Sequence, residues 1–167
     1  MNILIFIGVS LIPLVLGAIW YNPKFGFANT WLKASGITGQ YASGANMALV
    51  MGLLFLFSLM LSLALSRYTV HQYGVESLFI SNPDFKNPNS EISKYTADFK
   101  NKYGAIHRNF GHGAFQGVLA GLLFALPFIA TGALFERRGF KYIAIHVGYR
   151  VVCCAIMCGI LSAFLKV

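Results

Sequence analysis

The chain has 167 residues, of which 57% are hydrophobic and only 11% are charged. A soluble domain has about 25% charged residues, so a chain this apolar cannot cover a water-facing surface and we expect lipid to surround it. The net charge of +8 does not predict nucleic-acid binding, because no basic run is interleaved with elements that could read a groove. Lys and Arg beside membrane spans set topology and contact anionic headgroups, so we expect the lipid bilayer as a partner and no nucleic acid.

The first apolar stretch covers residues 3–20 and contains no charged side chain. A helix of this length rises about 1.5 Å per residue and just spans about 30 Å of hydrocarbon. No basic segment precedes it, and it ends in Trp20 and Tyr21 rather than in a small-residue cleavage site. We therefore expect a span of the mature protein and not a signal peptide. The two aromatic rings suit the membrane–water interface.

A polar loop at residues 21–44 leads to a second apolar stretch at residues 45–66. Trp31 and Lys33 lie in this loop where a second interfacial anchor is expected. The longest extramembrane segment follows at residues 67–111. This segment is too short to predict a separate domain.

Apolar side chains in that segment recur at steps of three and four residues, which predicts an amphipathic helix. They are Ile92, Tyr95, Phe99, Tyr103, Ile106 and Phe110. Lys94, Asp98 and Lys102 lie on another face at four-residue spacing with alternating sign, which is favourable. We expect the helix to rest on the bilayer surface with its aromatic rings inserted, the alternative being a groove for a partner. We also expect it to run almost continuously into the third span.

Two further apolar stretches, at residues 113–135 and 142–165, are joined by a short basic turn at residues 136–141. No water satisfies open backbone in lipid, so these spans must be helices. The sequence therefore predicts an all-α membrane protein, a four-transmembrane-helix bundle with an amphipathic helix preceding the third span. We expect residues 1–167 to form a single integral membrane domain.

Basic residues near the spans bear on orientation, because cytoplasmic loops are enriched in Lys and Arg. The loops on one side carry Lys24, Lys33, Arg137, Arg138 and Lys141, and the other side carries Arg67, Lys86, Lys94, Lys100, Lys102, Arg108 and Lys166. Charges far from the spans count less, and the short turn at residues 136–141 has the higher charge density. We therefore predict that loops 21–44 and 136–141 face the cytoplasm.

Small residues predict where the last two spans pack. Gly113, Gly117 and Gly121 form a row of small residues at four-residue spacing, and such rows let helix backbones approach closely in lipid. Packing within the chain is the expected use of the row, and a dimer contact is the alternative. Gly148 and Gly159 lie on a small face of the last span, where we also expect helix packing.

The opposite side of the last span is polar. At about 100° per residue, His146, Tyr149 and Arg150 lie on one arc, which Cys153 and Met157 continue. Arg150 lies roughly 12 Å from the start of the predicted span. A charge at that depth costs about 2.5–3.5 kcal/mol unless it is paired or hydrated.

Two interpretations of Arg150 follow. In the first, Arg150, His146 and Tyr149 line a hydrated site that holds an anionic group, with Glu136 or Tyr21 nearby. In the second, the span starts late and the Arg150 guanidinium reaches the interface along its own side chain.

His112 and Gln116 lie four residues apart at the start of the third span. They predict either a ligand or proton site, or an interfacial helix start whose polar side chains bond each other or water. The sulfur atoms of Cys153 and Met157, with Cys154 as a further candidate, fit core packing better than a copper site. No nucleophile–base pair, metal-hydrolase spacing or phosphate loop is present, so we expect no enzyme, no cofactor and no metal.

Several motifs resemble those of one bacterial family. They are Trp20-Tyr21-Asn22-Pro23-Lys24-Phe25-Gly26 with Trp31, Leu134-Phe135-Glu136-Arg137-Arg138, Gly148-Tyr149, and Met157-Cys158-Gly159-Ile160-Leu161. Over nearly its whole length the chain is similar to small four-span membrane proteins catalogued as domain of unknown function 1761. This resemblance implies four spans, the bacterial cytoplasmic (inner) membrane and basic turns on the cytoplasmic side, and it implies no activity. Gln116 stands where longer-loop relatives are expected to have a second His.

Two functions fit these features. The first is a non-catalytic subunit or accessory factor that docks to a larger membrane assembly, or that associates with itself, through its small-residue faces. The second is a small oligomeric transporter or ligand-binding protein that holds an anionic group at the stripe of His146, Tyr149 and Arg150.

Overall fold

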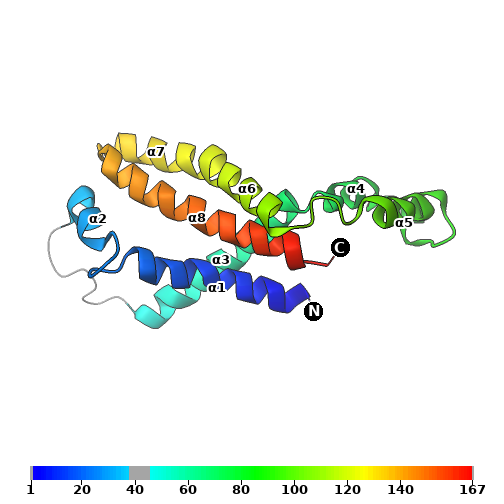
Figure 1. Cartoon of the computed structure of the whole chain (residues 1–167), viewed down its shortest axis with the longest axis horizontal. Helices are drawn as coiled ribbons and strands as arrows, with labels where there is room; N and C mark the ends of the chain where they lie inside the picture. Colours follow the sequence, from blue (N-terminus) through cyan, green and yellow to red (C-terminus); the bar gives the residue numbers. More distant parts are fainter. Residues whose placement is uncertain (1, 38–45, 167) are drawn as a thin grey trace.

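The computed structural model describes residues 2–37 and 46–166. Four long helical segments cross its body, namely α1 (Asn2–Trp20), α3 (Met47–Thr69), the segment Phe110–Phe135, and α8 (Phe140–Phe164). Each is long and apolar enough to span a membrane, and the described residues contain no strand. The predicted all-α class and four-helix bundle are therefore confirmed (Figure 1). The first residue of the predicted second span, Ala45, lies outside the described residues.

Helix α8 is the central element of the bundle. It packs against α1, α3 and the third span, and also against the short helix α2 (Ala28–Ser35). In an 18-residue apolar stretch of α8, 44% of the residues are buried, whereas the share is 17% in each of the other three spans. Those three helices therefore leave many apolar side chains exposed, where lipid or another chain must cover them.

The third span is one helical segment with a widened turn in its middle. It comprises α6 (Phe110–Ala120), the π-helical turn η2 (Gly121–Ala125) and α7 (Leu126–Phe135). Pro127 has no N–H to donate to the carbonyl four residues before it. The N–H of Leu126 bonds the Gly121 carbonyl five residues before it, which is the bond of a π turn. The backbone thus accommodates the proline without leaving the helix.

Between α3 and α6 the chain forms a small head beyond the end of the bundle (Figure 1). The head contains α4 (Gln72–Phe79), η1 (Pro83–Lys86) and α5 (Glu91–Tyr103). Ser90 caps α5 by accepting a bond from the N–H of Ser93. Helix α5 is the predicted amphipathic helix, and Lys102 pairs with Asp98 at 2.9 Å on its polar face.

The expectation that α5 runs almost continuously into the third span is wrong. The helix ends at Tyr103, and the chain from residue 104 to residue 109 is not helical. His107 adopts a left-handed φ of 60°, which no helix continues through. The apolar spacing that includes Ile106 and Phe110 continues across this break, so periodicity alone did not reveal it.

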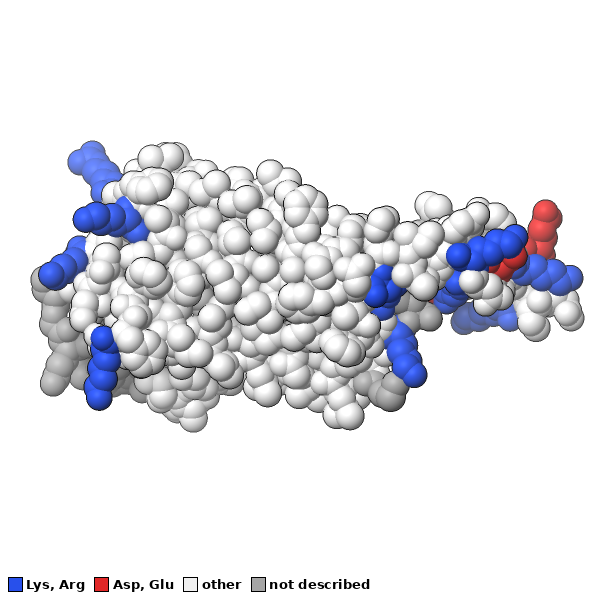
Figure 2. Space-filling model, viewed as in Figure 1, with Lys and Arg blue, Asp and Glu red and all other residues white. Residues whose placement is uncertain are grey.

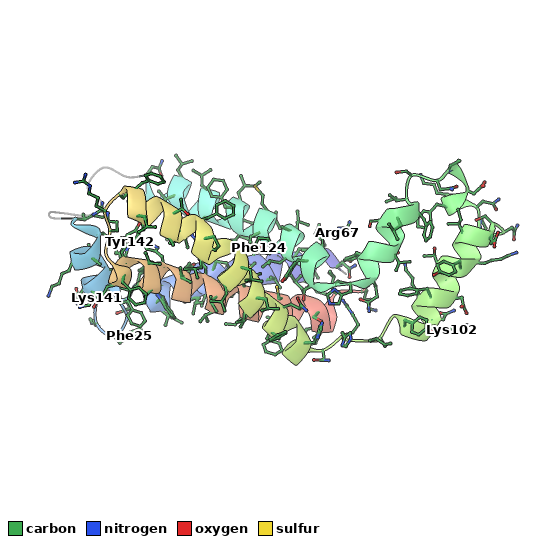
Figure 3. The ribbon with its side chains drawn as sticks, turned by 90° about the horizontal axis from the view of Figure 1, so that it is seen from above. Phe25, Arg67, Lys102, Phe124, Lys141 and Tyr142 are labelled. Carbon is green, nitrogen blue, oxygen red and sulfur yellow. The ribbon has the colours of Figure 1, made fainter. Side chains whose placement is uncertain are left out.

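On the face in Figure 2, the charged side chains lie at the two ends of the molecule and the belt between them carries none. One end carries α2 and the turn between α7 and α8, and the other carries both termini and the head. Lys141 and Tyr142 lie at the first end, Arg67 lies where the head begins, and Lys102 lies on the head (Figure 3). The described parts of loops 21–44 and 136–141 thus lie at the same end. Residues 38–45 of the first loop lie outside the described residues.

Candidate functional site

A tight turn after α1 brings α2 back over the start of α8. The N–H of Phe27 bonds the Trp20 carbonyl at 2.7 Å. A Cβ atom at Gly26 would lie 2.5 Å from the carbonyl oxygens of Ile19 and Trp20, so only glycine fits this turn. Helix α2 then ends at Ser35, and Gly36 caps it with a left-handed φ of 65°. This fold places Trp31 against α8.

His146 is the centre of the polar cluster at this end. Its Nε2 lies 2.9 Å from the indole Nε1 of Trp31, and its Nδ1 lies 3.3 Å from the hydroxyl oxygen of Tyr21. An indole N–H only donates, so Nε2 of His146 must accept. The ring is therefore neutral with its proton on Nδ1, and that N–H donates to the Tyr21 oxygen. We call Tyr21, Trp31 and His146 the aromatic cluster.

Burial keeps the Tyr21 hydroxyl neutral. Desolvation raises the pKa of Tyr21 to about 12, and the positive charge of Arg150 opposes this increase. Because the Tyr21 oxygen accepts from His146, its own hydrogen remains able to donate. The Tyr142 ring also lies against His146, with ring centroids 4.3 Å apart.

Tyr149 connects α8 to α1 rather than lining an open site. Its hydroxyl donates to the Pro13 carbonyl at 2.6 Å, and both groups are buried. A Cβ atom at Gly17 would lie 3.3 Å from the Tyr149 hydroxyl oxygen, so glycine at this position leaves room for the ring. The Trp20 indole donates to the Ile145 carbonyl at 3.2 Å beside it.

Arg150 is exposed, although it lies deep in the apolar segment. Its Cα is about 15 Å along the helix from Phe140, the first residue of α8. Its guanidinium carbon lies 5.2 Å from the centroid of the Tyr149 ring. Within residues 2–37 and 46–166 it has no hydrogen bond and no ion pair. Side chains of a helix tilt toward its N-terminus, which directs this cation toward the level of Tyr21.

Glu136 is not the counter-ion of Arg150 in this structure. It lies just after α7, and its carboxylate is 3.4 Å from Nε of Arg138. Arg138 in turn donates to the Ser35 carbonyl at the end of α2. Glu136 and Arg138 therefore hold the α7–α8 turn against α2, at the end of the bundle rather than beside Arg150.

His112 and Gln116 lie at the other end of the bundle, on α6, and take no part in the aromatic cluster. Nε2 of His112 lies 3.1 Å from Nε2 of His71. Gln116 is half-buried one turn further along α6. Of the seven residues predicted as ligand-binding, the structure brings together Tyr21, His146, Tyr149 and Arg150. It separates Glu136, His112 and Gln116 from them.

The predicted glycine row of α6 lies against the backbone of α8. A Cβ atom at Gly113 would lie 2.3 Å from the Cys158 carbonyl oxygen, and one at Gly117 would lie 2.1 Å from that of Cys154. At Gly121 it would lie 2.6 Å from the Val151 Cα. No side chain fits between the helices at these three positions.

The other two predicted packing glycines contact rings instead of backbone. A Cβ atom at Gly159 would lie 2.6 Å from the Phe110 ring, and one at Gly148 would lie 3.2 Å from the Trp20 ring. The three cysteines of α8 are free and buried.

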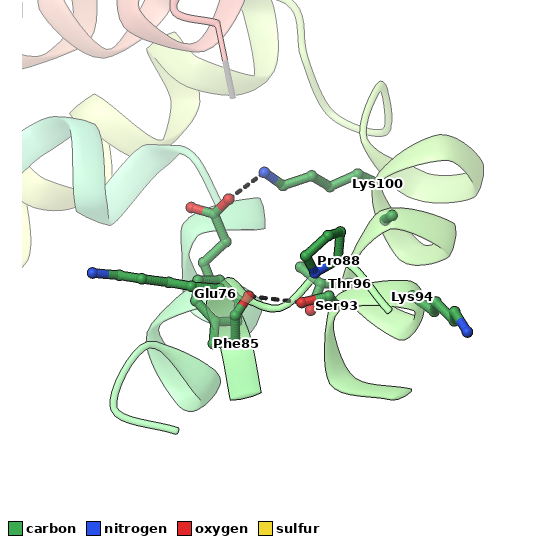
Figure 4. Close-up of a pocket in the computed structure, with 9 residues that line it drawn as sticks. Glu76, Phe85, Pro88, Ser93, Lys94, Thr96 and Lys100 are labelled. Atoms are coloured by element: carbon green, nitrogen blue, oxygen red, sulfur yellow. Dashed lines mark hydrogen bonds and ion pairs between the residues drawn. The ribbon is translucent and has the colours of Figure 1, made fainter. Parts of the chain in front are cut away.

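The head contains a hollow that sequence reasoning did not predict, because its walls come from α4, η1 and α5. Its volume is about 430 Å³. Lys100 pairs with Glu76 across it, and the Ser93 hydroxyl donates to the Phe85 carbonyl at 2.7 Å (Figure 4). The Glu76–Lys100 pair connects α4 to α5 and so stabilises the head.

The family described as "Protein of unknown function (DUF1761)" has a sequence model that matches residues 4–162. The chain belongs to this family. The match covers nearly the whole chain, including the aromatic cluster, Arg150 and the glycine row. Neither the curated proteins nor the solved structures gave a match.

Proposed function

We propose that this protein is a non-catalytic subunit or accessory factor that docks to another membrane protein through the side of α8 bearing Arg150. One observation carries the proposal. Arg150 is an exposed cation far inside an apolar helix, and its described contact is the ring of Tyr149. An isolated charge at such depth costs about 2.5–3.5 kcal/mol. A cation–π contact returns about 0.5–2 kcal/mol, less than this cost, and a further partner would offset the rest.

The chemistry of Arg150 indicates what that partner offers. A guanidinium binds a carboxylate through two parallel hydrogen bonds, and this pairing is strongest where water is excluded. We infer that a transmembrane helix of the partner presents an Asp or Glu at the depth of Arg150.

The aromatic cluster supports this function by fixing the docking face. The bond between Trp31 and His146 joins α2 to α8, and the bond between Tyr149 and Pro13 joins α8 to α1. Arg150 is adjacent in sequence to Tyr149 and four residues from His146. Its backbone position is therefore fixed before any partner binds, which lowers the entropic cost of docking.

Co-purification from the native host membrane tests this proposal with a matched set of variants. Wild type, Arg150→Lys, Arg150→Leu and Lys141→Leu are expressed at native level, and partners are quantified by mass spectrometry. Lys141 is an exposed cation on the same helix, in its first turn. We expect one stoichiometric membrane partner that Lys141→Leu retains and Arg150→Leu loses. Equal recovery with wild type and Arg150→Leu would contradict the proposal.

A small anion transporter or anion-binding protein is the second candidate, and the available hydrogen of the Tyr21 hydroxyl favours it. Arg150 and that hydroxyl would then bind one anionic group, and two or more copies would enclose a path. This candidate predicts that Arg150→Leu folds but loses anion binding or flux in proteoliposomes. Retained flux in that variant would exclude it.

The cellular location is part of the proposal. We propose the bacterial inner membrane, with the end that carries α2 and the α7–α8 turn facing the cytoplasm. The dense basic charge of that end supports this side, because cytoplasmic loops are enriched in Lys and Arg.

A further inference from the structure

Three histidines meet at the end of the bundle where the head begins. His71 lies between α3 and α4, His107 lies in the loop after α5, and His112 lies in the first turns of α6. The Nε2 atoms of His71 and His112 are 3.1 Å apart. The His107 ring stacks on His112, with centroids 4.4 Å apart and an interplanar angle of 19°. We call these residues the histidine cluster.

The backbone on both sides of the facing pair is fixed. The N–H of His112 bonds the side chain of Asn109 at 2.8 Å, and Gly113 beside it lies against α8. His71 lies between buried Val70 and buried Gln72, whose amide donates to the Ile106 carbonyl at 2.9 Å. The two rings thus face each other because the fold places them so, and His71 is exposed to solvent.

His107 adds backbone strain at the same place. Its φ of 60° is uncommon for a residue with a side chain, and such outliers persist where the surrounding structure imposes them. Its carbonyl accepts a hydrogen bond from the Ser162 hydroxyl at 3.0 Å. The chain therefore tolerates strain where it brings a third imidazole against the pair.

The distance between the two Nε2 atoms fits a shared metal ion. Imidazole nitrogens lie about 2.0–2.1 Å from Zn²⁺, so two of them in a tetrahedral site are roughly 3.3 Å apart. Imidazole is a preferred ligand of Zn²⁺, Cu²⁺ and Ni²⁺. Nearby cations are bound to other groups, since Arg67 lies over the Tyr73 ring and Arg108 donates to the Leu165 carbonyl.

We propose that His71 and His112 bind one divalent transition-metal ion through their Nε2 atoms. Among the described residues no group of three or more His, Cys, Asp or Glu is arranged to hold a metal. The ion therefore has two protein ligands, and water occupies its remaining positions. The His107 ring stacks on the His112 ring and so orients it.

The alternative is a plain hydrogen bond, in which one Nε2–H donates to the other Nε2. The Nε2–Nε2 distance of 3.1 Å fits both the metal site and the hydrogen bond, so geometry alone does not separate them. They differ in their response to added metal, because only the metal site binds one ion per chain with two nitrogen ligands.

Copper binding to the purified full chain in lipid nanodiscs tests the proposal. After chelator treatment, Cu²⁺ is added, and electron paramagnetic resonance counts the coordinated nitrogens. We expect one ion per chain with splitting from two imidazoles. His71→Asn and the double variant His71→Asn/His112→Asn should lose this signal, and His107→Ala should bind about tenfold more weakly.

Isothermal titration with Zn²⁺ and circular dichroism on the same samples separate lost ligands from lost fold. A variant that keeps the helical signal of wild type and binds no Zn²⁺ supports the site. If wild type binds no stoichiometric metal, or if the double variant binds as wild type does, the pair is a hydrogen bond only and the proposal is wrong.

Discussion

Helix α8 packs against its neighbours by different means on two sides. On the side of α6, Gly117 brings the backbone of α6 directly against the Cys154 carbonyl of α8. On the side of α1 and α2, large rings fill the space, and their polar atoms bond across it, as Tyr149 does to Pro13 and Trp31 does to His146.

The difference shows that one helix can pack closely on one side and place polar groups on the other side in lipid. Apolar burial gives little drive between helices there, so close backbone contact holds the α6 side together. The other side contains polar atoms that bond across it, whereas the Arg150 guanidinium has no hydrogen bond or ion pair to any described residue. The packed side thus supports the fold, and in the proposed function the Arg150 charge on the polar side binds another molecule.

The largest expected effect comes from breaking the α6 side. Gly117→Leu places a side chain where the Cys154 carbonyl lies, and we expect a loss of about 3 kcal/mol in the free energy of unfolding. Gly132→Leu on α7 is the control, because nothing lies within 4 Å of a Cβ atom there. Chemical unfolding in detergent measures both variants. Equal stability of the two would show that the glycine contact is not what holds α6 to α8.

A smaller effect is expected from the polar side. Tyr149→Phe keeps the ring and removes the bond to the Pro13 carbonyl, at a cost of about 1 kcal/mol. Tyr142→Phe is the matched control, since the Tyr142 hydroxyl has no hydrogen bond to any described residue. The same unfolding measurement compares them, and a cost for Tyr142→Phe as large as for Tyr149→Phe would exclude the hydrogen bond as the cause.

A still smaller and local effect is expected from Trp31→Phe. This variant removes the N–H that donates to Nε2 of His146. The free energy needed to separate α2 from α8 should therefore fall by about 0.5 kcal/mol. Hydrogen exchange measured by mass spectrometry should rise in residues 28–35 and stay unchanged in α6. Unchanged exchange in residues 28–35 would mean that other contacts hold α2.

The last effect is confined to alkaline solution and is absent at pH 7, where the other variants are measured. The pKa of Tyr21 is raised to about 12 in the folded chain, above its ordinary value of 10.0. Between these values the unfolded chain loses the proton and the folded chain keeps it, so stability falls as pH rises from about 10 to 12. Tyr21→Phe should remove this part of the decline and change nothing at pH 7. Absorbance at the tyrosinate band should show one fewer late-titrating group in the variant than in wild type, and an unchanged titration in the variant would contradict the assignment.

The sequence predicted the fold class because its signals are long and simple. Uncharged stretches of spanning length indicate helices wherever they occur, and the family resemblance agreed with them. The break after α5 was missed because apolar spacing continues through it, whereas the conformation of His107 depends on contacts such as that with Ser162.

The sequence predicted the polar stripe of α8, but it predicted only some of the residues that contact the stripe. Helical periodicity places His146, Tyr149 and Arg150 on one arc. The bond between Trp31 and His146 was not predicted, because it depends on the turn at Gly26 that folds α2 back onto α8. Glu136 was expected near Arg150, but its pairing with Arg138 at the turn depends on tertiary structure. His71 and His107 carry no local pattern, and only the fold places them beside His112.

Native mass spectrometry of the protein extracted gently from its own membrane, at native expression level, tests the central claim most directly. The account predicts a stoichiometric complex with another membrane polypeptide that persists in Lys141→Leu and is absent in Arg150→Leu. A wild-type chain that is always free of protein partners, whether alone or with a bound anionic lipid or small molecule, would contradict it.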